Sequence, residues 1–317
     1  SIMDSASSSS SVNTRDLNMM PQWQPADRIR ANLIICHGMA EHGARYARLA
    51  KALTRQGIAV YAPNLRGHGP DAASQLGQLV GGWAALEADL LHWVQSVRSL
   101  CPDTPLILLG HSMGSYLVQG FLLQHSALID AVILSGSNAH PPGLSRVGRL
   151  AARIEGLMRA DGAAAETLGK LSFGQFNKAF TPNRTEFDWL SRDLAEVDAY
   201  INDPMCGFTL SADYWQELFS TLLRIANREQ LQHIRPTLPL LIMGGDADPV
   251  SAGHGLRKLQ QRLQQAQLKK VELLLYPQAR HEVFNEINRD QVTSDMLSWI
   301  MTTLSLDSLG NPADENA

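Results

Sequence analysis

The stretch Leu106-Ile-Leu-Leu-Gly-His-Ser-Met-Gly-Ser-Tyr-Leu-Val-Gln-Gly120 decides the fold. Four apolar residues typical of a buried strand run directly into a helical pattern, and Ser112 stands at the junction between Gly110 and Gly114. A serine at such a corner lies in a strained turn with its hydroxyl exposed above the strand end. The residues two positions before and after it, Gly110 and Gly114, must be nearly free of side chains, because the strand and helix backbones contact each other there. The pattern predicts a nucleophile elbow at Ser112.

Composition places the chain among ordinary globular proteins. Of its 317 residues, 44% are hydrophobic and 18% are charged, which is enough apolar material for a large core. The formal net charge of −4 offers no general attraction for phosphate backbones, so we expect no nucleic-acid partner. Cys36, Cys101 and Cys206 show no C-x-x-C spacing, which indicates reduced thiols and a cytoplasmic protein.

Neither end of the sequence predicts a membrane anchor. The serine-rich segment 1–14 lacks the apolar stretch of a signal peptide, and we expect it to be a disordered tail. We expect residues 306–317 to form a flexible C-terminal tail. No apolar run approaches the roughly 20 residues that a membrane-spanning helix requires.

Short apolar runs alternate with helical patterns along the rest of the chain. Strands are expected at Leu33–Cys36, Ile58–Tyr61, Leu106–Leu109, Ala131–Leu134, Leu240–Met243 and Val271–Tyr276. Helices are expected at Tyr46–Gln56, Trp83–Leu100, Ser115–Gln124, His254–Gln265 and Gln291–Leu304. This alternation predicts the α/β class, with a mostly parallel sheet covered by helices on both faces.

One long interval breaks the alternation. Residues 137–237 show helical signals but no convincing strand, which is too long for a simple connection. We expect residues 15–136 and 238–305 to form the core and the interval to form a helical cap. Because ligands in open α/β sheets bind beyond the carboxyl ends of the strands, such a cap would cover the site.

A serine nucleophile needs a base to take its proton and an acid to orient that base. Among ten histidines, His281 lies just past the last expected strand and is the candidate base. Asp246 and Asp248 both follow the preceding strand. We favour Asp248 as the acid, because Pro249 biases its backbone to an extended form. A turn-forming role is the alternative for such an aspartate and fits Asp246.

The oxyanion of a tetrahedral intermediate requires backbone donors. The residue after the nucleophile, Met113, supplies one N–H, and Met39 in the loop after the first strand is the expected second donor. The same loop carries His37 and His42 in an H-x-x-x-E-H pattern. That is not the spacing of a helical zinc site, and Gly38 disfavours the helix, so we expect no metal.

The segment Arg146–Met158 places apolar residues at near-helical spacing beside three arginines. One interpretation is a cap helix that packs this apolar side on the core. The other is that the apolar side contacts lipid surfaces transiently and delivers single-chain lipids to the site.

Several segments together resemble one branch of the α/β-hydrolase superfamily, the monoacylglycerol lipases and bacterial lysophospholipases, with serine aminopeptidase-like relatives. The resemblance extends from about Leu17 to Leu304. It rests on the motifs His37-Gly-Met-Ala-Glu-His-Gly-Ala-Arg-Tyr46, Asn64-Leu-Arg-Gly-His-Gly69, Gly110-His-Ser-Met-Gly114, Asn202-Asp-Pro204 and Gly245-Asp-Ala-Asp-Pro249.

The resemblance implies roles for individual residues. It makes Ser112, Asp248 and His281 the nucleophile, acid and base, with Met39 and Met113 lining the oxyanion hole. It places Glu41 and Arg45 near the alcohol side of the site, where a loop-bracing ion pair is the alternative role. Phe284 stands where monoglyceride lipases typically carry a second histidine and is a candidate substrate-binding residue.

These observations predict a serine carboxylic-ester hydrolase that forms an acyl-enzyme and needs no cofactor. The expected substrate is a single-chain lipid, either a monoacylglycerol or a lysophospholipid, or a short-chain ester. A peptidase or amidase of the same fold and a non-catalytic ligand-binding module are the alternatives. The expected location is cytoplasmic or peripheral to the membrane, and the oligomeric state is left open.

Overall fold

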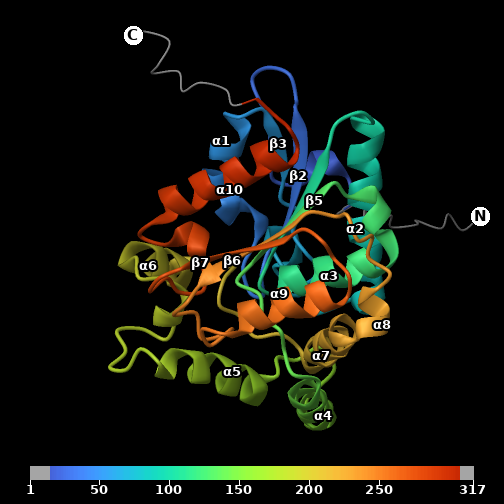
Figure 1. Ribbon diagram of the computed structural model, residues 1–317. Helices are drawn as coiled ribbons and strands as arrows, with labels where there is room; N and C mark the ends of the chain where they lie inside the picture. The colour runs from blue at the N-terminus through green and yellow to red at the C-terminus, as the bar shows by residue number, and fades with distance from the viewer. Residues whose placement is uncertain (1–14, 308–317) are drawn as a thin grey trace, which may run out of the picture.

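The computed structural model describes residues 15–307, so the N-terminal tail and residues 308–317 lie outside the described part. Its centre is a seven-stranded sheet of order β1-β3-β2-β4-β5-β6-β7 (Figure 1). The strands are β1 (Gln22–Trp23), β2 (Ala31–Cys36), β3 (Ile58–Tyr61), β4 (Leu106–His111), β5 (Ala131–Ser135), β6 (Leu240–Gly245) and β7 (Val271–Tyr276). All strand pairs are parallel except β1 with β3. The sequence missed β1, which is too short for a hydrophobic pattern.

Helices cover both faces of the sheet, as predicted. They are α1 (Ala47–Thr54), α2 (Gly82–Leu100), α3 (Met113–His125), α9 (Gly255–Gln265) and α10 (Arg289–Thr303). Alternate residues of the buried strands face opposite layers. In β4, Leu106 and Leu108 join the cluster under α2, α3 and α9, whereas Ile107 and Leu109 join the cluster under α1 and α10. Leu306, which we expected in the C-terminal tail, still packs against the second cluster.

The interval 137–237 contains helices and no strand. Its elements are α4 (Pro142–Met158), α5 (Glu166–Lys178), α6 (Leu194–Asn202), α7 (Ala212–Ala226), α8 (Arg228–Leu231) and a short 3-10 turn at Asp188–Leu190. In Figure 1, α4, α5 and α7 gather in the lower part of the view, whereas α6 lies at the left, below α10. No helix among residues 15–307 is both long and apolar enough to cross a membrane.

Helix α4 packs on α7 through its small residues, and its apolar side points away. A Cβ at Gly148 would lie 2.5 Å from the Phe219 ring, and one at Gly156 would lie 3.2 Å from Ala212. Ser145 and Ala152 are buried on the same side. The apolar residues are more than half exposed, namely Leu144, Val147, Leu150, Ile154, Leu157 and Met158. Packing of the apolar side on the core is therefore wrong, because the small residues allow the closer helix contact.

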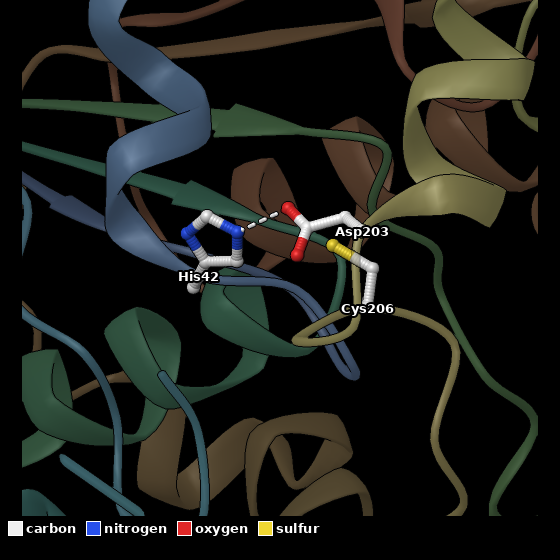
Figure 2. Close-up of side chains that lie close together, drawn as sticks. All are labelled: His42, Asp203 and Cys206. Atoms are coloured by element: carbon white, nitrogen blue, oxygen red, sulfur yellow. Dashed lines mark hydrogen bonds and ion pairs between the residues drawn. The ribbon is translucent and has the colours of Figure 1, made fainter. Parts of the chain in front are cut away.

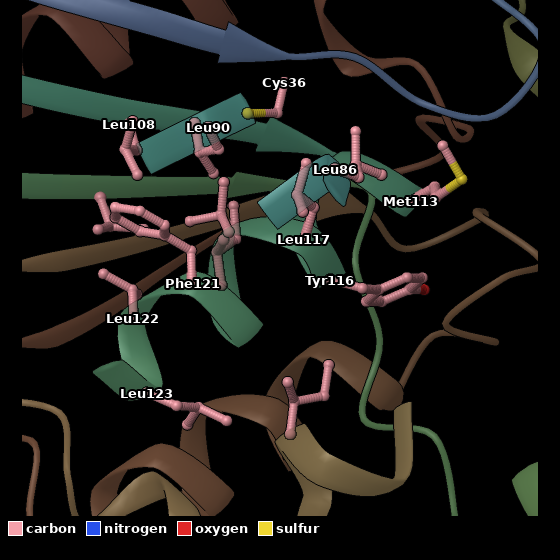
Figure 3. Packing of buried hydrophobic residues seen from close by; sticks show 14 of the residues in the cluster. Cys36, Leu86, Leu90, Leu108, Met113, Tyr116, Leu117, Phe121, Leu122 and Leu123 are labelled. Carbon is pink, nitrogen blue, oxygen red and sulfur yellow. The ribbon is translucent and has the colours of Figure 1, made fainter. Parts of the chain in front are cut away.

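Helix α3 carries the elbow into the core. Figure 3 shows its inner side packed among residues of α2, β2 and β4, and the helix buries eleven consecutive residues from Met113 to Leu123. At its start the backbones are in contact, because a Cβ at Gly114 would lie 1.9 Å from the Cys36 carbonyl oxygen. A Cβ at Gly110 would lie 2.5 Å from the Gly114 carbonyl oxygen. Both glycines are thus required by the close packing.

We predict that Gly114→Ala lowers the free energy of unfolding by about 3 kcal/mol or more, because neither backbone can move without breaking the sheet. The matched control is Gly143→Ala in α4, where a Cβ would meet nothing within 4 Å. That variant should remain within about 1 kcal/mol of the wild type. Urea unfolding of both proteins measures the difference, and equal stability of the two variants would contradict the contact.

Candidate active site

Ser112 lies in the backbone conformation of an elbow. Its φ of 52° and ψ of −118° are strained for a residue with a side chain. The strain is held in place by the tight glycine contacts and by the Ser112 amide, which donates to the Ser135 carbonyl at 2.9 Å. Ser112 lines a cavity next to the start of α3.

The two candidate aspartates have different partners in the structure. Asp248 Oδ2 lies 2.9 Å from Nδ1 of His281, and both side chains are buried. Asp246 is exposed and accepts a hydrogen bond from the Gln278 amide at 2.6 Å, so its carboxylate links two loops rather than bonding the backbone of its own turn. With Nδ1 of His281 engaged by Asp248, Nε2 remains for proton transfer. His281 and Ser112 line the same cavity.

The charge of Asp248 also tunes His281. Burial alone would lower the pKa of His281, but the charge and hydrogen bond of Asp248 outweigh it and raise the pKa above its ordinary value. Glu282 and Glu41 act in the same direction. Positive charge on the imidazole is therefore stabilised at this site.

In the loop after β2, the Met39 amide has no partner in the described part of the chain, although the amides on both sides of it are engaged. The Gly38 amide donates to Glu41 at 2.9 Å, and the Ala40 amide donates to Nε2 of His68 at 3.1 Å. Within residues 15–307 no hydrogen bond involves the Met39 amide, nor the Met113 amide at the start of α3. A Cβ on Gly38 would lie 3.3 Å from the Ser112 Cβ, so this loop runs directly beside the serine.

Two histidines from the glycine-rich turns brace that loop. Nε2 of His37 accepts from the Leu65 amide at 3.0 Å, and Nε2 of His68 accepts from Ala40. Accepting at Nε2 requires neutral rings, and burial lowers both pKa values, that of His68 to about 4. Both histidines therefore have a structural role in this loop.

Glu41 and Arg45 form the ion pair that was the alternative to their contact with substrate, together with a third residue that the sequence did not suggest. Arg45 Nη1 lies 3.1 Å from Glu41 and 2.8 Å from Glu282, and Nη2 lies 3.0 Å from the second oxygen of Glu282. Glu282 directly follows His281, but Arg45 is 237 positions away, so only the fold brings the three together. Glu41 and Glu282 line the cavity, whereas Arg45 lies behind them.

Phe284 is placed elsewhere. It is buried in the cluster under α1 and α10 and is not among the residues that line the cavity. The structure therefore gives it a packing role rather than the contact with substrate that we expected. The short 3-10 turn at Val283–Asn285 directs it into the core.

The cavity that joins these residues has a volume of about 450 Å³, and its lining includes a polar group, here called its polar end, and an apolar group, here called its apolar end. Its polar end carries Gly38, Glu41, His111 and Glu282. The apolar end consists of residues from the 137–237 interval, namely Phe173, Phe176, Trp189, Trp215, Leu218, Phe219 and Leu222; the same interval also contributes the polar lining residues Asn138, His140, Ser145, Ser172 and Gln175. Ser112 and His281 belong to the same lining, so a molecule with one apolar chain and one polar group matches the cavity.

Two of the sequence motifs meet outside the cavity. Nε2 of His42 lies 2.6 Å from Asp203, and Cys206 lies beside them (Figure 2). The Gly207 amide also donates to the Ala40 carbonyl at 3.0 Å. These bonds tie the end of α6 to the loop after β2. Cys36, Cys101 and Cys206 are all free thiols.

Comparison with known proteins gives a consistent result. Residues 27–288 match the family model described as serine aminopeptidase, S33. The monoacylglycerol lipase of Mycolicibacterium smegmatis is 31% identical over 292 residues, which is 89% of this chain and 92% of the relative. The human monoglyceride lipase is 28% identical over 281 residues, 84% of each chain.

Solved structures share the fold. A carboxyl esterase from Bacillus coagulans in complex with glycerol superposes with a TM-score of 0.80 at 26% identity, covering 89% of this chain and 93% of that one. A soluble variant of the Saccharomyces cerevisiae monoglyceride lipase gives 0.70 at 21% identity over 92% and 91%. With its parallel sheet, its elbow and the family match, the chain belongs to the serine aminopeptidase S33 family and has the α/β-hydrolase fold.

Proposed function

We propose that this protein is a serine carboxylic-ester hydrolase in which Ser112, His281 and Asp248 form the catalytic triad. Ser112 Oγ attacks the ester carbonyl while Nε2 of His281 takes its proton. The tetrahedral intermediate collapses, and the leaving alcohol receives that proton. Water then attacks the acyl-enzyme with His281 again as base, which releases the acid and restores Ser112. The buried Asp248–His281 contact beside the strained serine is the observation that carries this proposal.

The amides of Met39 and Met113 are the proposed oxyanion donors. Neither has a hydrogen-bond partner within residues 15–307, while the amides on both sides of Met39 are engaged. Met113 is also the first residue of α3, where the helix dipole favours negative charge. An oxyanion between these two amides would be stabilised without rearrangement of the loop.

The two ends of the cavity suggest how the substrate lies. The aromatic end suits one acyl chain, and the carboxylate-bearing end suits the alcohol group. Glu41 and Glu282 offer acceptors for alcohol hydroxyls there. Monoacylglycerols, lysophospholipids and short-chain esters remain the proposed substrates; the names of the relatives support monoacylglycerols and carboxyl esters. A peptidase is the alternative that the family description favours.

The interval 137–237 is the proposed cap, and its helix α4 is the proposed membrane contact. The exposed apolar side of α4 is flanked by the exposed residues Arg146, Arg149 and Arg153, a combination typical of helices that bind anionic lipid surfaces. Leu144 and Val147 of the same helix also line the cavity, so lipid could pass from the surface toward Ser112.

The first prediction concerns the nucleophile and the base. Ser112→Ala or His281→Ala should lower turnover of p-nitrophenyl esters by at least about three orders of magnitude, with the double variant little worse, because the two act as one unit. A parallel assay with an aminoacyl p-nitroanilide measures the peptidase alternative. Additive losses would argue against a shared proton transfer, and faster amide than ester cleavage would replace the esterase proposal.

The second prediction separates the aspartates. Asp248→Asn should lower turnover roughly 10³- to 10⁴-fold. Because Asp248 raises the pKa of His281, and the base must be neutral, the acid limb of kcat/KM should also move to lower pH in this variant. Asp246→Asn is the matched control and should leave the pH profile in place. A reversed pattern in the two pH profiles would show that the acid has been assigned wrongly.

The third prediction concerns α4. Replacing Leu150 and Leu157 with serine should weaken binding to anionic vesicles and lower activity on dispersed long-chain esters by roughly tenfold, while hydrolysis of a soluble short-chain ester stays nearly intact. Leu100→Ser, at an equally exposed leucine at the end of α2, is the control. Vesicle sedimentation and parallel assays measure these effects. If the wild type does not bind vesicles, or if the variant loses the same activity on both substrates, α4 has no lipid contact.

A further inference from the structure

The polar end of the cavity carries two carboxylates and no cationic side chain. Glu41 and Glu282 line it, and no lysine or arginine is among the lining residues of the described chain. His111 at this end and His140 elsewhere in the lining add no charge near neutral pH, because burial lowers their pKa values to about 3 and about 4 respectively. His281 is paired with Asp248. A bound alcohol group therefore meets acceptors and no spare positive charge.

Arg45 lies directly behind the two carboxylates, and its positive charge is paired with both of them. Its guanidinium binds Glu282 through both nitrogens at 2.8 and 3.0 Å and Glu41 at 3.1 Å. The three side chains are 11%, 7% and 3% exposed for Arg45, Glu282 and Glu41. Whether or not Glu41 holds a proton, the sum of the three charges is zero or negative.

Two kinds of leaving group would behave differently at this end. The hydroxyls of an uncharged polyol can donate to Glu282, whose ionised carboxylate accepts hydrogen bonds only, and can exchange hydrogen bonds with Glu41, whose pKa burial raises. A phosphate group would be taken out of water beside two carboxylates, with no cation free to pair with it. Burial of an unpaired anion is strongly unfavourable. Preference for a polyol over a phosphate group therefore depends on whether Arg45 stays paired with the carboxylates.

We propose that Glu282 is a specificity-determining residue: by holding Arg45 with both oxygens, it selects esters of uncharged polyols over single-chain lipids that carry a phosphate. This inference rests on the proposed function, because it places the leaving alcohol at the polar end. It distinguishes the two lipid classes that the sequence left open, in favour of monoacylglycerols.

The kinetic test compares monodecanoylglycerol with decanoyl lysophosphatidylglycerol, both below the concentrations at which they aggregate. The wild type should show kcat/KM roughly a hundredfold higher for the neutral ester. Glu282→Gln, which frees one face of Arg45 at unchanged size, should reduce this ratio at least about tenfold. Adding Arg45→Gln to that variant should restore the preference, because the released cation is then removed.

Glu286→Gln is the matched control. Glu286 is a fully buried carboxylate that binds Arg192 at 3.1 Å and lies four residues further along the chain, outside the cavity lining. Its replacement should leave the ratio of the two substrates unchanged. A wild-type ratio within about threefold of unity, or equal ratios for Glu282→Gln and the wild type, would overturn the proposal.

A measurement of lipid binding tests the selectivity independently of the proposed hydrolysis. In Ser112→Ala, quenching of the cavity residues Trp189 and Trp215 reports binding of either lipid without turnover. The neutral lipid should bind at least about tenfold more tightly, and Glu282→Gln in this background should reduce the difference. If the wild type hydrolyses no ester but this preference persists, the proposed reaction fails and the selectivity stands. Equal binding of both lipids overturns the selectivity alone.

Discussion

The contact among three backbone segments at the end of β4 is the constraint on which the whole site depends. There is no room for a Cβ at Gly114, which would lie 1.9 Å from the Cys36 carbonyl oxygen, or at Gly110. The helix must therefore leave the strand through a residue with positive φ, which is Ser112. The same contact brings the loop after β2 beside the serine. One packing condition thus places the proposed nucleophile and both proposed oxyanion donors.

The sequence predicted the features that depend on local pattern. The elbow follows from two glycines around a serine, and the buried strands follow from continuous apolar runs. Asp248 was distinguished from Asp246 by the proline that follows it. In contrast, nothing local predicts the bond between Arg45 and Glu282, because the fold alone joins positions 237 apart. The sequence also does not predict the orientation of α4, because its pattern allows either the apolar side or the small-residue side to face the core. The contact between Gly148 and Phe219 shows that the small-residue side does.

The buried ion pair between Arg45 and Glu282 affects the proposed base, His281. Burial acts to raise the pKa of Glu282, but the charge and hydrogen bonds of Arg45 outweigh it and hold the pKa at about 2. The resulting carboxylate lies next to His281 and, with Asp248, favours its protonated form. One ion pair therefore stabilises the imidazolium expected during ester cleavage and also sets the charge at the alcohol end of the cavity.

The most direct test of the account is covalent labelling of the folded protein with a fluorophosphonate, followed by mass spectrometry of the intact chain and its peptides. Such reagents react with serines that are activated by a neighbouring base. We predict one adduct per chain, located on Ser112 and absent from Ser112→Ala and from unfolded protein. No adduct on the folded chain, or an adduct on another serine with Ser112 unmodified, would contradict it.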